Sequence, residues 1–109
     1  MFRLMAGVVL CMGLAATAAA QDAKVAKGEK LFADQKCSLC HSIGDKGNKK
    51  GPLDGVGTKL KTDEIREWLM DAKGMTAKTK ATRKPEMKAF ALAKGDVDAL
   101  VAYLTTLKK

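Results

Sequence analysis

Three residues that can bind metals or form covalent bonds lie close together in this 109-residue chain: Cys37, Cys40 and His41. Together they make a C-x-x-C-H sequence, which is typical of covalent attachment of a c-type haem. Two thiols at this spacing can reach the two vinyl groups of one haem, and the next imidazole then lies under the iron. We therefore predict one haem c per chain, bound covalently through Cys37 and Cys40, with His41 as an iron ligand.

Three other kinds of site are alternatives for the C-x-x-C-H sequence. A zinc site needs four ligands, and the chain after residue 20 has no other cysteine or histidine, so a carboxylate would have to complete it. A thioredoxin-like redox pair needs C-x-x-C beside a βαβ pattern, and no strand pattern is visible. A plain structural disulfide is compatible with an oxidising compartment but leaves His41 without a role. Haem attachment is favoured over all three.

The first twenty residues are typical of an export signal. Arg3 supplies a positive charge, residues 4–20 carry none, and Ala18-Ala19-Ala20 fits a cleavage site. We expect residues 1–20 to be a signal peptide and residues 21–109 to be one domain in the periplasm. The alternative is a retained membrane anchor, although this uncharged run is short and rich in alanine.

Apolar spacing in the remaining chain predicts helices and no strands. We expect one helix from residue 23 to about residue 35, and a second from Thr62-Asp63 to a stop at Gly74. The last helix should follow an N-cap at Gly95-Asp96 and present its apolar residues at helical spacing. Glycine-rich residues 42–60 and polar residues 75–85 are predicted to be loops. The expected fold class is all-α.

In this order, the motifs resemble those of the class I (mitochondrial-type) cytochromes c, across residues 23–109. Gly28 and Phe32 resemble the family's N-terminal helix pair, and Leu100 and Tyr103 resemble its partners on the last helix. The resemblance implies a small cytochrome c fold, in which the N- and C-terminal helices pack together around a covalently bound haem.

Two further residues are candidates for contact with the haem. Gly51-Pro52-Leu53 resembles the family's proline loop, whose carbonyl accepts a hydrogen bond from the proximal imidazole, so Pro52 is a candidate cofactor-binding residue. Trp68 is a second candidate, since its ring could pack on the haem edge or its indole N–H could bond a propionate. An ordinary core aromatic on the second helix is an equal alternative for Trp68.

The second iron ligand should be a methionine, because a thioether is the best remaining soft neutral donor. Met87 lies shortly before Phe90, which resembles the family's ligand loop, and we predict His41 and Met87 as the two metal ligands. Met70 is expected on the second helix, as a core or surface side chain. Met75 follows Gly74 in a predicted loop and stays an alternative. Lys88 stands where many relatives have proline, which weakens the expected rigidity of this loop.

The chain is basic, with 20 Lys and Arg against 12 Asp and Glu and a formal net charge of +8. Six of these charges surround the proposed ligand loop, where the resemblance places the exposed haem edge, so we expect docking to acidic redox partners. These residues are Lys73, Lys78, Lys80, Arg83, Lys84 and Lys88. A merely solvated basic loop is the alternative. Nucleic-acid binding is not expected, because no aromatic residues alternate with the basic ones.

The function expected from these features is one-electron transfer by a soluble, monomeric carrier, which is not an enzyme and takes no small-molecule substrate. The predicted His41 and Met87 ligation favours the reduced iron and raises the reduction potential. Two alternatives stay open. The chain could be the electron-accepting subunit of a multi-subunit dehydrogenase, or a haem sensor or peroxidase whose iron keeps an open position.

Overall fold

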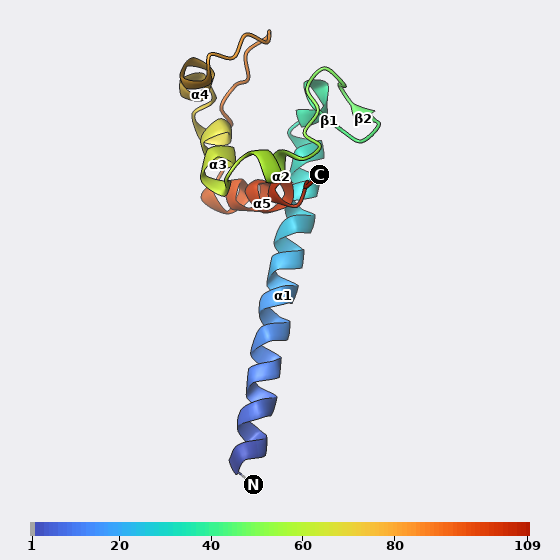
Figure 1. Cartoon of the computed structure of the whole chain (residues 1–109), viewed down its shortest axis with the longest axis vertical. Coiled ribbons are helices and arrows are strands. Elements are labelled where there is room, and N and C mark those ends of the chain that lie inside the picture. Colours follow the sequence, from blue (N-terminus) through green and yellow to red (C-terminus); the bar gives the residue numbers. More distant parts are fainter. Residues whose placement is uncertain (1) are drawn as a thin grey trace.

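The first helix is long and its outer half projects away from the rest of the chain. In the computed structural model, residues 2–109 are described, with side chains from residue 17 onward. Helix α1 spans Phe2–Asp34 and so ends where the sequence predicted (Figure 1). It also continues through the predicted signal peptide, whose alanines favour helix. Met1 and the side chains up to residue 16 lie outside the description, and cleavage after Ala20 stays a prediction. In the described part of the chain, no helix has the length and apolarity needed to cross a membrane.

Helix α5, Lys94–Thr105, packs across the inner half of α1 (Figure 1). The contact is close because Gly28 is buried against the backbone of Ala99, where a side chain on residue 28 would collide. The rings of Phe32 and Tyr103 meet edge to face, with centroids 6.0 Å apart, a favoured aromatic geometry. The predicted pairing of the N- and C-terminal helices is confirmed.

The hydrophobic core forms between α5 and helix α3, Thr62–Met70. Ile65 and Leu69 of α3 are buried against one face of α5, since both helices repeat apolar residues at three- and four-residue spacing. The α5 residues in this cluster are Val97, Leu100, Val101 and Leu104. An ion pair between Arg66 and Asp98, 2.5 Å apart, lies beside the core and joins the same two helices.

Helix α4, Ala72–Thr79, lies where the sequence predicted the end of one helix and the start of a loop. The prediction of a stop at Gly74 was wrong because the chain turns earlier, at Asp71. The Asp71 carboxylate accepts a hydrogen bond from the Gly74 N–H at 3.2 Å and so caps the new helix. Met75, predicted in a loop, is therefore a helical residue and is buried.

The last helix also begins earlier than predicted, with Ala93 at its N-cap position and Gly95 inside its first turn. The apolar residues of this helix lie on one face as expected, but Leu107 lies beyond the helix end. The glycine at residue 95 did not break the helix, because a glycine in the first turn costs little when the following residues are well packed.

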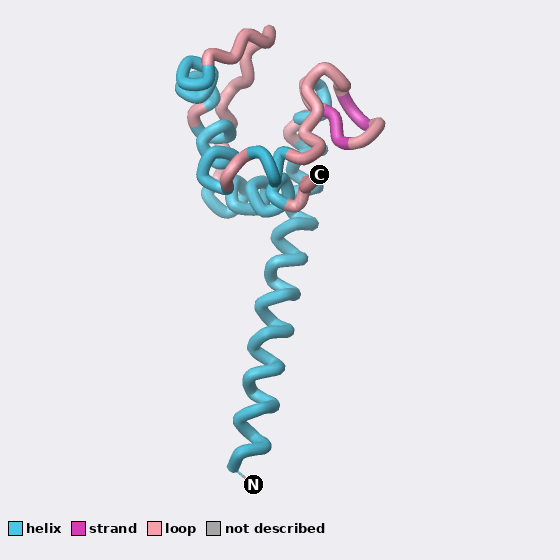
Figure 2. Tube along the Cα trace, in the orientation of Figure 1, coloured by secondary structure: helices cyan, strands magenta, loops and turns pink. Residues whose placement is uncertain are grey.

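The glycine-rich region from 42 to 60 contains short regular pieces joined by turns (Figure 2). Strands β1, Ser42–Ile43, and β2, Lys46–Gly47, form an antiparallel hairpin in which Ser42 pairs with Gly47. Helix α2, Val56–Lys59, follows and packs on α5. These elements were too short to give a periodic signal in the sequence. With helices dominating the chain, the all-α prediction is confirmed.

Candidate functional site

The two cysteines and the histidine lie in one tight turn directly after α1. Lys36 adopts a left-handed conformation, with a φ of 58°, and this ends the helix. A short 3₁₀ helix, η1, then spans Cys37–Leu39, and the His41 N–H donates to the Cys37 carbonyl at 3.0 Å. The backbone of this turn therefore places Cys37, Cys40 and His41 next to one another, and their binding to a cofactor stays a prediction. We call residues 37–53, which build this side of the site, the attachment segment.

The two thiols differ in their surroundings. Cys37 is half-buried, and burial raises the pKa of its thiol, whereas Cys40 is exposed. Both are free thiols, so the structural disulfide weighed from the sequence is not formed. Among the residues that the structure describes, no group of three or more His, Cys, Asp or Glu side chains could hold a metal ion, as a zinc site would require.

His41 is oriented by a backbone carbonyl. Its Nδ1 lies 3.0 Å from the Gly51 oxygen, and since a carbonyl only accepts, Nδ1 carries the proton. That leaves the lone pair of Nε2 free to bind a metal. Burial lowers the pKa of His41, and the nearby Arg83 charge lowers it further, although the Gly51 bond acts in the other direction. On balance, these effects favour the neutral imidazole, the form that ligates iron.

The carbonyl belongs to Gly51, the residue before Pro52, within the predicted proline loop. The same oxygen accepts from the Ser42 N–H at 3.1 Å, and the Leu53 N–H donates to the Ser42 carbonyl at 2.8 Å. Ser42 is buried, so this pairing is shielded from water. Pro52 itself is exposed, and its contact with a cofactor stays a prediction.

These observations test whether the residues suit a covalently attached haem. Two free thiols share one turn with an imidazole that presents an unused Nε2, and the second ring nitrogen is already hydrogen-bonded. Histidine ligands of metals usually have such a partner on the other nitrogen. The donor set therefore fits the group that the sequence predicted.

The methionines occupy three different environments. Met87 is partly buried and packs against the hydrophobic cluster, from an extended stretch that we call the Met87 segment, residues 81–93. Met75 is 4% exposed inside α4, whereas Met70 ends α3 and is 59% exposed. Met70 is therefore a surface side chain, one of the two outcomes expected for it. The choice of Met87 as iron ligand stays a prediction.

Trp68 lies on α3 and is half-buried, but it is not among the residues of the hydrophobic cluster. Its indole ring is therefore not an ordinary member of that core. The proposed contact with the haem edge or a propionate stays a prediction.

One contact near the site was not foreseen from the sequence. The guanidinium Nη2 of Arg83 donates to the Cys40 carbonyl at 2.6 Å, which links the Met87 segment to the attachment segment. The sequence analysis placed Arg83 only among the basic residues. No local signal could have identified this contact, because its two residues are 43 positions apart.

The chain was compared with protein families at this point. The family model for cytochrome c matches residues 25–108. The chain belongs to the cytochrome c family. No curated protein and no solved structure matches it significantly. The match covers the end of α1 from residue 25, the whole of α5 and the whole attachment segment. The helical structure agrees with the small all-α cytochrome c fold.

Membership of the cytochrome c family establishes the cofactor and the general activity. The cofactor is covalently bound haem c with its iron, and the activity is haem-based electron transfer. Proteins of this family are generally electron carriers, and their domains are typically extracellular or periplasmic.

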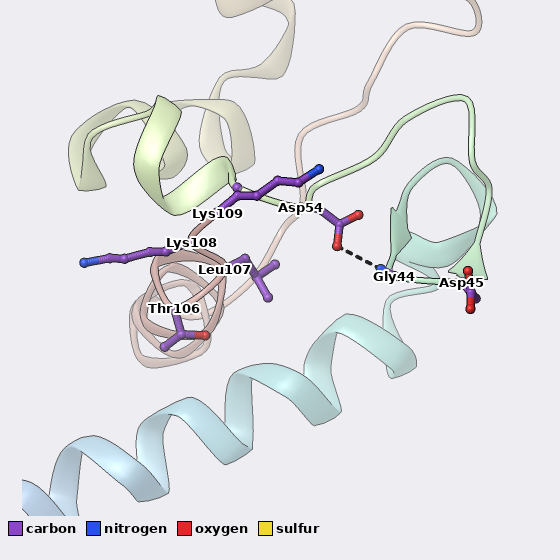
Figure 3. Close-up of a pocket in the computed structure, with 8 residues that line it drawn as sticks. Gly44, Asp45, Asp54, Thr106, Leu107, Lys108 and Lys109 are labelled. Atoms are coloured by element: carbon purple, nitrogen blue, oxygen red, sulfur yellow. Dashed lines mark hydrogen bonds between the residues drawn. The ribbon is translucent and has the colours of Figure 1, made fainter.

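A surface groove that does not include the two cysteines or His41 lies against the hairpin turn and the C-terminus (Figure 3). Its walls are the hairpin turn at Gly44 and Asp45, the Asp54-Gly55 turn and the C-terminal residues 106–109. Asp54 accepts a hydrogen bond from the Gly44 N–H at 2.9 Å, which holds the two turns together. None of the predicted site residues lines this groove.

Proposed function

We propose that this cytochrome c is an exported, soluble electron carrier whose haem is attached at Cys37 and Cys40 and whose iron ligands are His41 and Met87. The observation that carries the proposal is the hydrogen bond from His41 Nδ1 to the Gly51 oxygen, next to two free thiols. It fixes the tautomer and the direction of the ring before any ligand binds. When bound, haem supplies the one-electron couple of its iron.

The residues of this chain control the electron transfer by binding and by excluding water. His41 supplies a neutral nitrogen on one side of the site, and Met87 supplies a neutral sulfur on the other. Two neutral ligands favour the reduced iron over the oxidised iron, which carries one more positive charge. No residue of the chain has to move a proton during this reaction.

Met87 is preferred to Met75 for a structural reason. The Met87 segment is bonded to the attachment segment through Arg83 and Cys40, and Met87 lies four residues from that bond. Met75 is already enclosed within α4. A ligand on an extended stretch can adjust its position to the iron without unwinding a helix.

The ligands can be tested with matched variants of the haem-loaded protein. Met87→Ala should abolish the weak absorption band near the red edge of the visible spectrum that reports the iron–sulfur bond in the oxidised protein. Met75→Ala should leave this band in place. The reverse result would reassign the ligand to Met75. If the unaltered reduced protein bound carbon monoxide and showed no such band, it would be a sensor or peroxidase rather than a carrier.

We propose that the exposed basic residues around the Met87 segment guide the protein to acidic redox partners. All six basic residues named from the sequence are exposed. Two of them have acidic neighbours, since Lys84 lies 3.0 Å from Glu86 and Lys78 lies 3.9 Å from Glu67. Four positive charges are therefore left without an ion pair in the described residues, and they can attract an acidic surface.

This docking proposal can be tested with small oxidants in place of the partner. Oxidation by the anion hexacyanoferrate(III) should slow as salt increases, because salt screens the attraction. A Lys73→Gln, Lys80→Gln, Lys88→Gln variant should slow it at low salt. Replacing Lys59, Lys108 and Lys109 with Gln removes the same number of charges outside this group and should have a smaller effect. Equal effects of the two variants would show that only the overall charge matters.

Export and assembly need separate tests. N-terminal sequencing of the protein from the periplasm should begin at Gln21, whereas a retained Met1 would favour an anchored form. Gel filtration of the purified protein should give a monomer. A stable complex with a larger protein would instead support the dehydrogenase-subunit alternative.

A further inference from the structure

The Met87 segment has few bonds to the rest of the protein. The Ala81 N–H donates to the Thr76 carbonyl at its start, and the Phe90 N–H donates to the Leu69 carbonyl near its end, each at 3.0 Å. Between them, residues 82–89 form extended chain that reaches away from the helices (Figure 2). Without another polar tie, this stretch would be held only at its two ends and by the packing of Met87 against the hydrophobic cluster.

Arg83 supplies that tie. Its bond to the Cys40 carbonyl is the only hydrogen bond or ion pair that joins residues 82–89 to another segment within the described part of the chain. The other polar contact of this stretch, between Lys84 and Glu86, is internal to it. The bond is charge-assisted, and such bonds are stronger than neutral ones.

The attachment segment has room for the guanidinium because residue 51 is glycine. A Cβ on Gly51 would collide with Arg83, lying 2.8 Å from Cζ, and also with the Cys40 carbonyl oxygen. The oxygen of Gly51 is the one that orients His41. The Arg83 charge therefore lies beside the peptide groups that hold the proximal imidazole.

We propose that Arg83 is a positioning residue, which holds the Met87 segment against the attachment segment and places a fixed positive charge beside His41. This rests on the proposed ligation by His41 and Met87. Holding the segment keeps the sulfur available to the iron and limits its exchange for outside ligands. A positive charge near the iron disfavours the oxidised form, so Arg83 also raises the reduction potential.

The test compares Arg83→Gln with Arg83→Lys and with Lys59→Gln in the haem-loaded protein. Lys59→Gln removes one exposed positive charge from α2, outside both segments. In Arg83→Gln the reduction potential should fall more than in Lys59→Gln. Imidazole should bind the oxidised protein about three- to tenfold more tightly, as expected for the loss of one such hydrogen bond. Arg83→Lys keeps the charge and should recover most of the potential.

Hydrogen exchange separates this proposal from the identity of the iron ligand. The hydrogen-bonded amides of Ala81 and Phe90, at the two ends of this stretch, should exchange faster in Arg83→Gln than in the unaltered protein and in Lys59→Gln. If Met87 is not the ligand, Met87→Ala leaves the iron–sulfur band intact, while Arg83→Gln still speeds this exchange. If Arg83→Gln matches Lys59→Gln in potential, imidazole affinity and exchange, the positioning role of Arg83 is refuted.

Discussion

In the attachment segment, backbone groups bond to one another at short range, whereas the Met87 segment is extended chain held at a few points. Gly51 accepts from both His41 and the Ser42 N–H, and Leu53 bonds back to Ser42. Among the described residues, the Met87 segment has backbone bonds only near its ends and one side-chain bond to another segment, from Arg83. The polypeptide alone thus orients the His41 imidazole, whereas fewer bonds hold the Met87 segment in place.

This difference indicates which iron ligand should exchange first. Local opening needs least free energy where few hydrogen bonds and apolar contacts must break. We therefore expect outside ligands to displace the methionine while His41 stays bound. The largest effect is expected at the α1–α5 contact, which supports both segments, and the smallest at the ion pair between Arg66 and Asp98, which lies outside both.

The α1–α5 contact supports both segments, and breaking it should have the largest effect. In Gly28→Ala the new Cβ would lie 2.7 Å from the Tyr103 Cβ and would collide with the Ala99 carbonyl. We expect a loss of about 3 kcal/mol in the free energy of unfolding, at the upper end of typical overpacking costs. Urea unfolding of the haem-loaded protein measures it.

Gly95→Ala is the matched control for this change. A Cβ at residue 95 would meet nothing within 4 Å, so alanine there should be neutral or stabilising by up to about 1 kcal/mol, since it favours helix. Equal stability of the two alanine variants would show that α1 and α5 can separate without cost.

Gly51→Ala should damage the attachment segment and its contact with Arg83. The added Cβ would collide with the Cys40 carbonyl and displace Arg83. We expect a loss of about 2 kcal/mol, within the usual range for overpacking. Nuclear magnetic resonance of the oxidised protein should show altered His41 ring signals. Unchanged His41 signals would argue that the Gly51 oxygen does not orient the ring.

Phe90→Ala should loosen the Met87 segment and leave the attachment segment intact. Phe90 is half-buried against the hydrophobic cluster, so the loss should be about 1 to 2 kcal/mol, below the cost for a fully buried phenylalanine. Imidazole should bind the oxidised protein more tightly. Phe90→Leu is the control, because it keeps an apolar side chain, and it should lie close to the unaltered protein in both measurements.

Asp98→Asn should have the smallest effect, and that effect should depend on pH. A hydrogen bond from Arg66 is the main cause that lowers the pKa of Asp98. The folded pKa then lies below the unfolded value, so the stabilisation is present above about pH 4 and is lost as pH falls through the folded pKa. The stability difference between the unaltered protein and Asp98→Asn should therefore vanish in acid. A stability difference that persisted unchanged in acid would show that the bond from Arg66 is not its cause.

The parts of the fold that follow from local patterns were predicted correctly. The end of α1, the start of α3 and the contact between Gly28 and Tyr103 all agree with the structure. Helix α4 was missed because its residues are polar and contain Gly74, and only the Asp71 cap shows why a helix begins there. The hairpin at Ser42 was missed because two-residue strands show no alternation.

The sequence by itself determined the haem chemistry, because Cys37, Cys40 and His41 are neighbours in the chain and their spacing alone sets what they can bind. It also determined the all-α class, through the periodicity of apolar residues. The family resemblance already implied the bond between the His41 imidazole and the carbonyl of the Gly51-Pro52-Leu53 loop. Only the tertiary structure decided that Arg83 reaches Cys40. This contact joins residues 43 positions apart, which meet only after the helices have packed, so no local pattern could specify it.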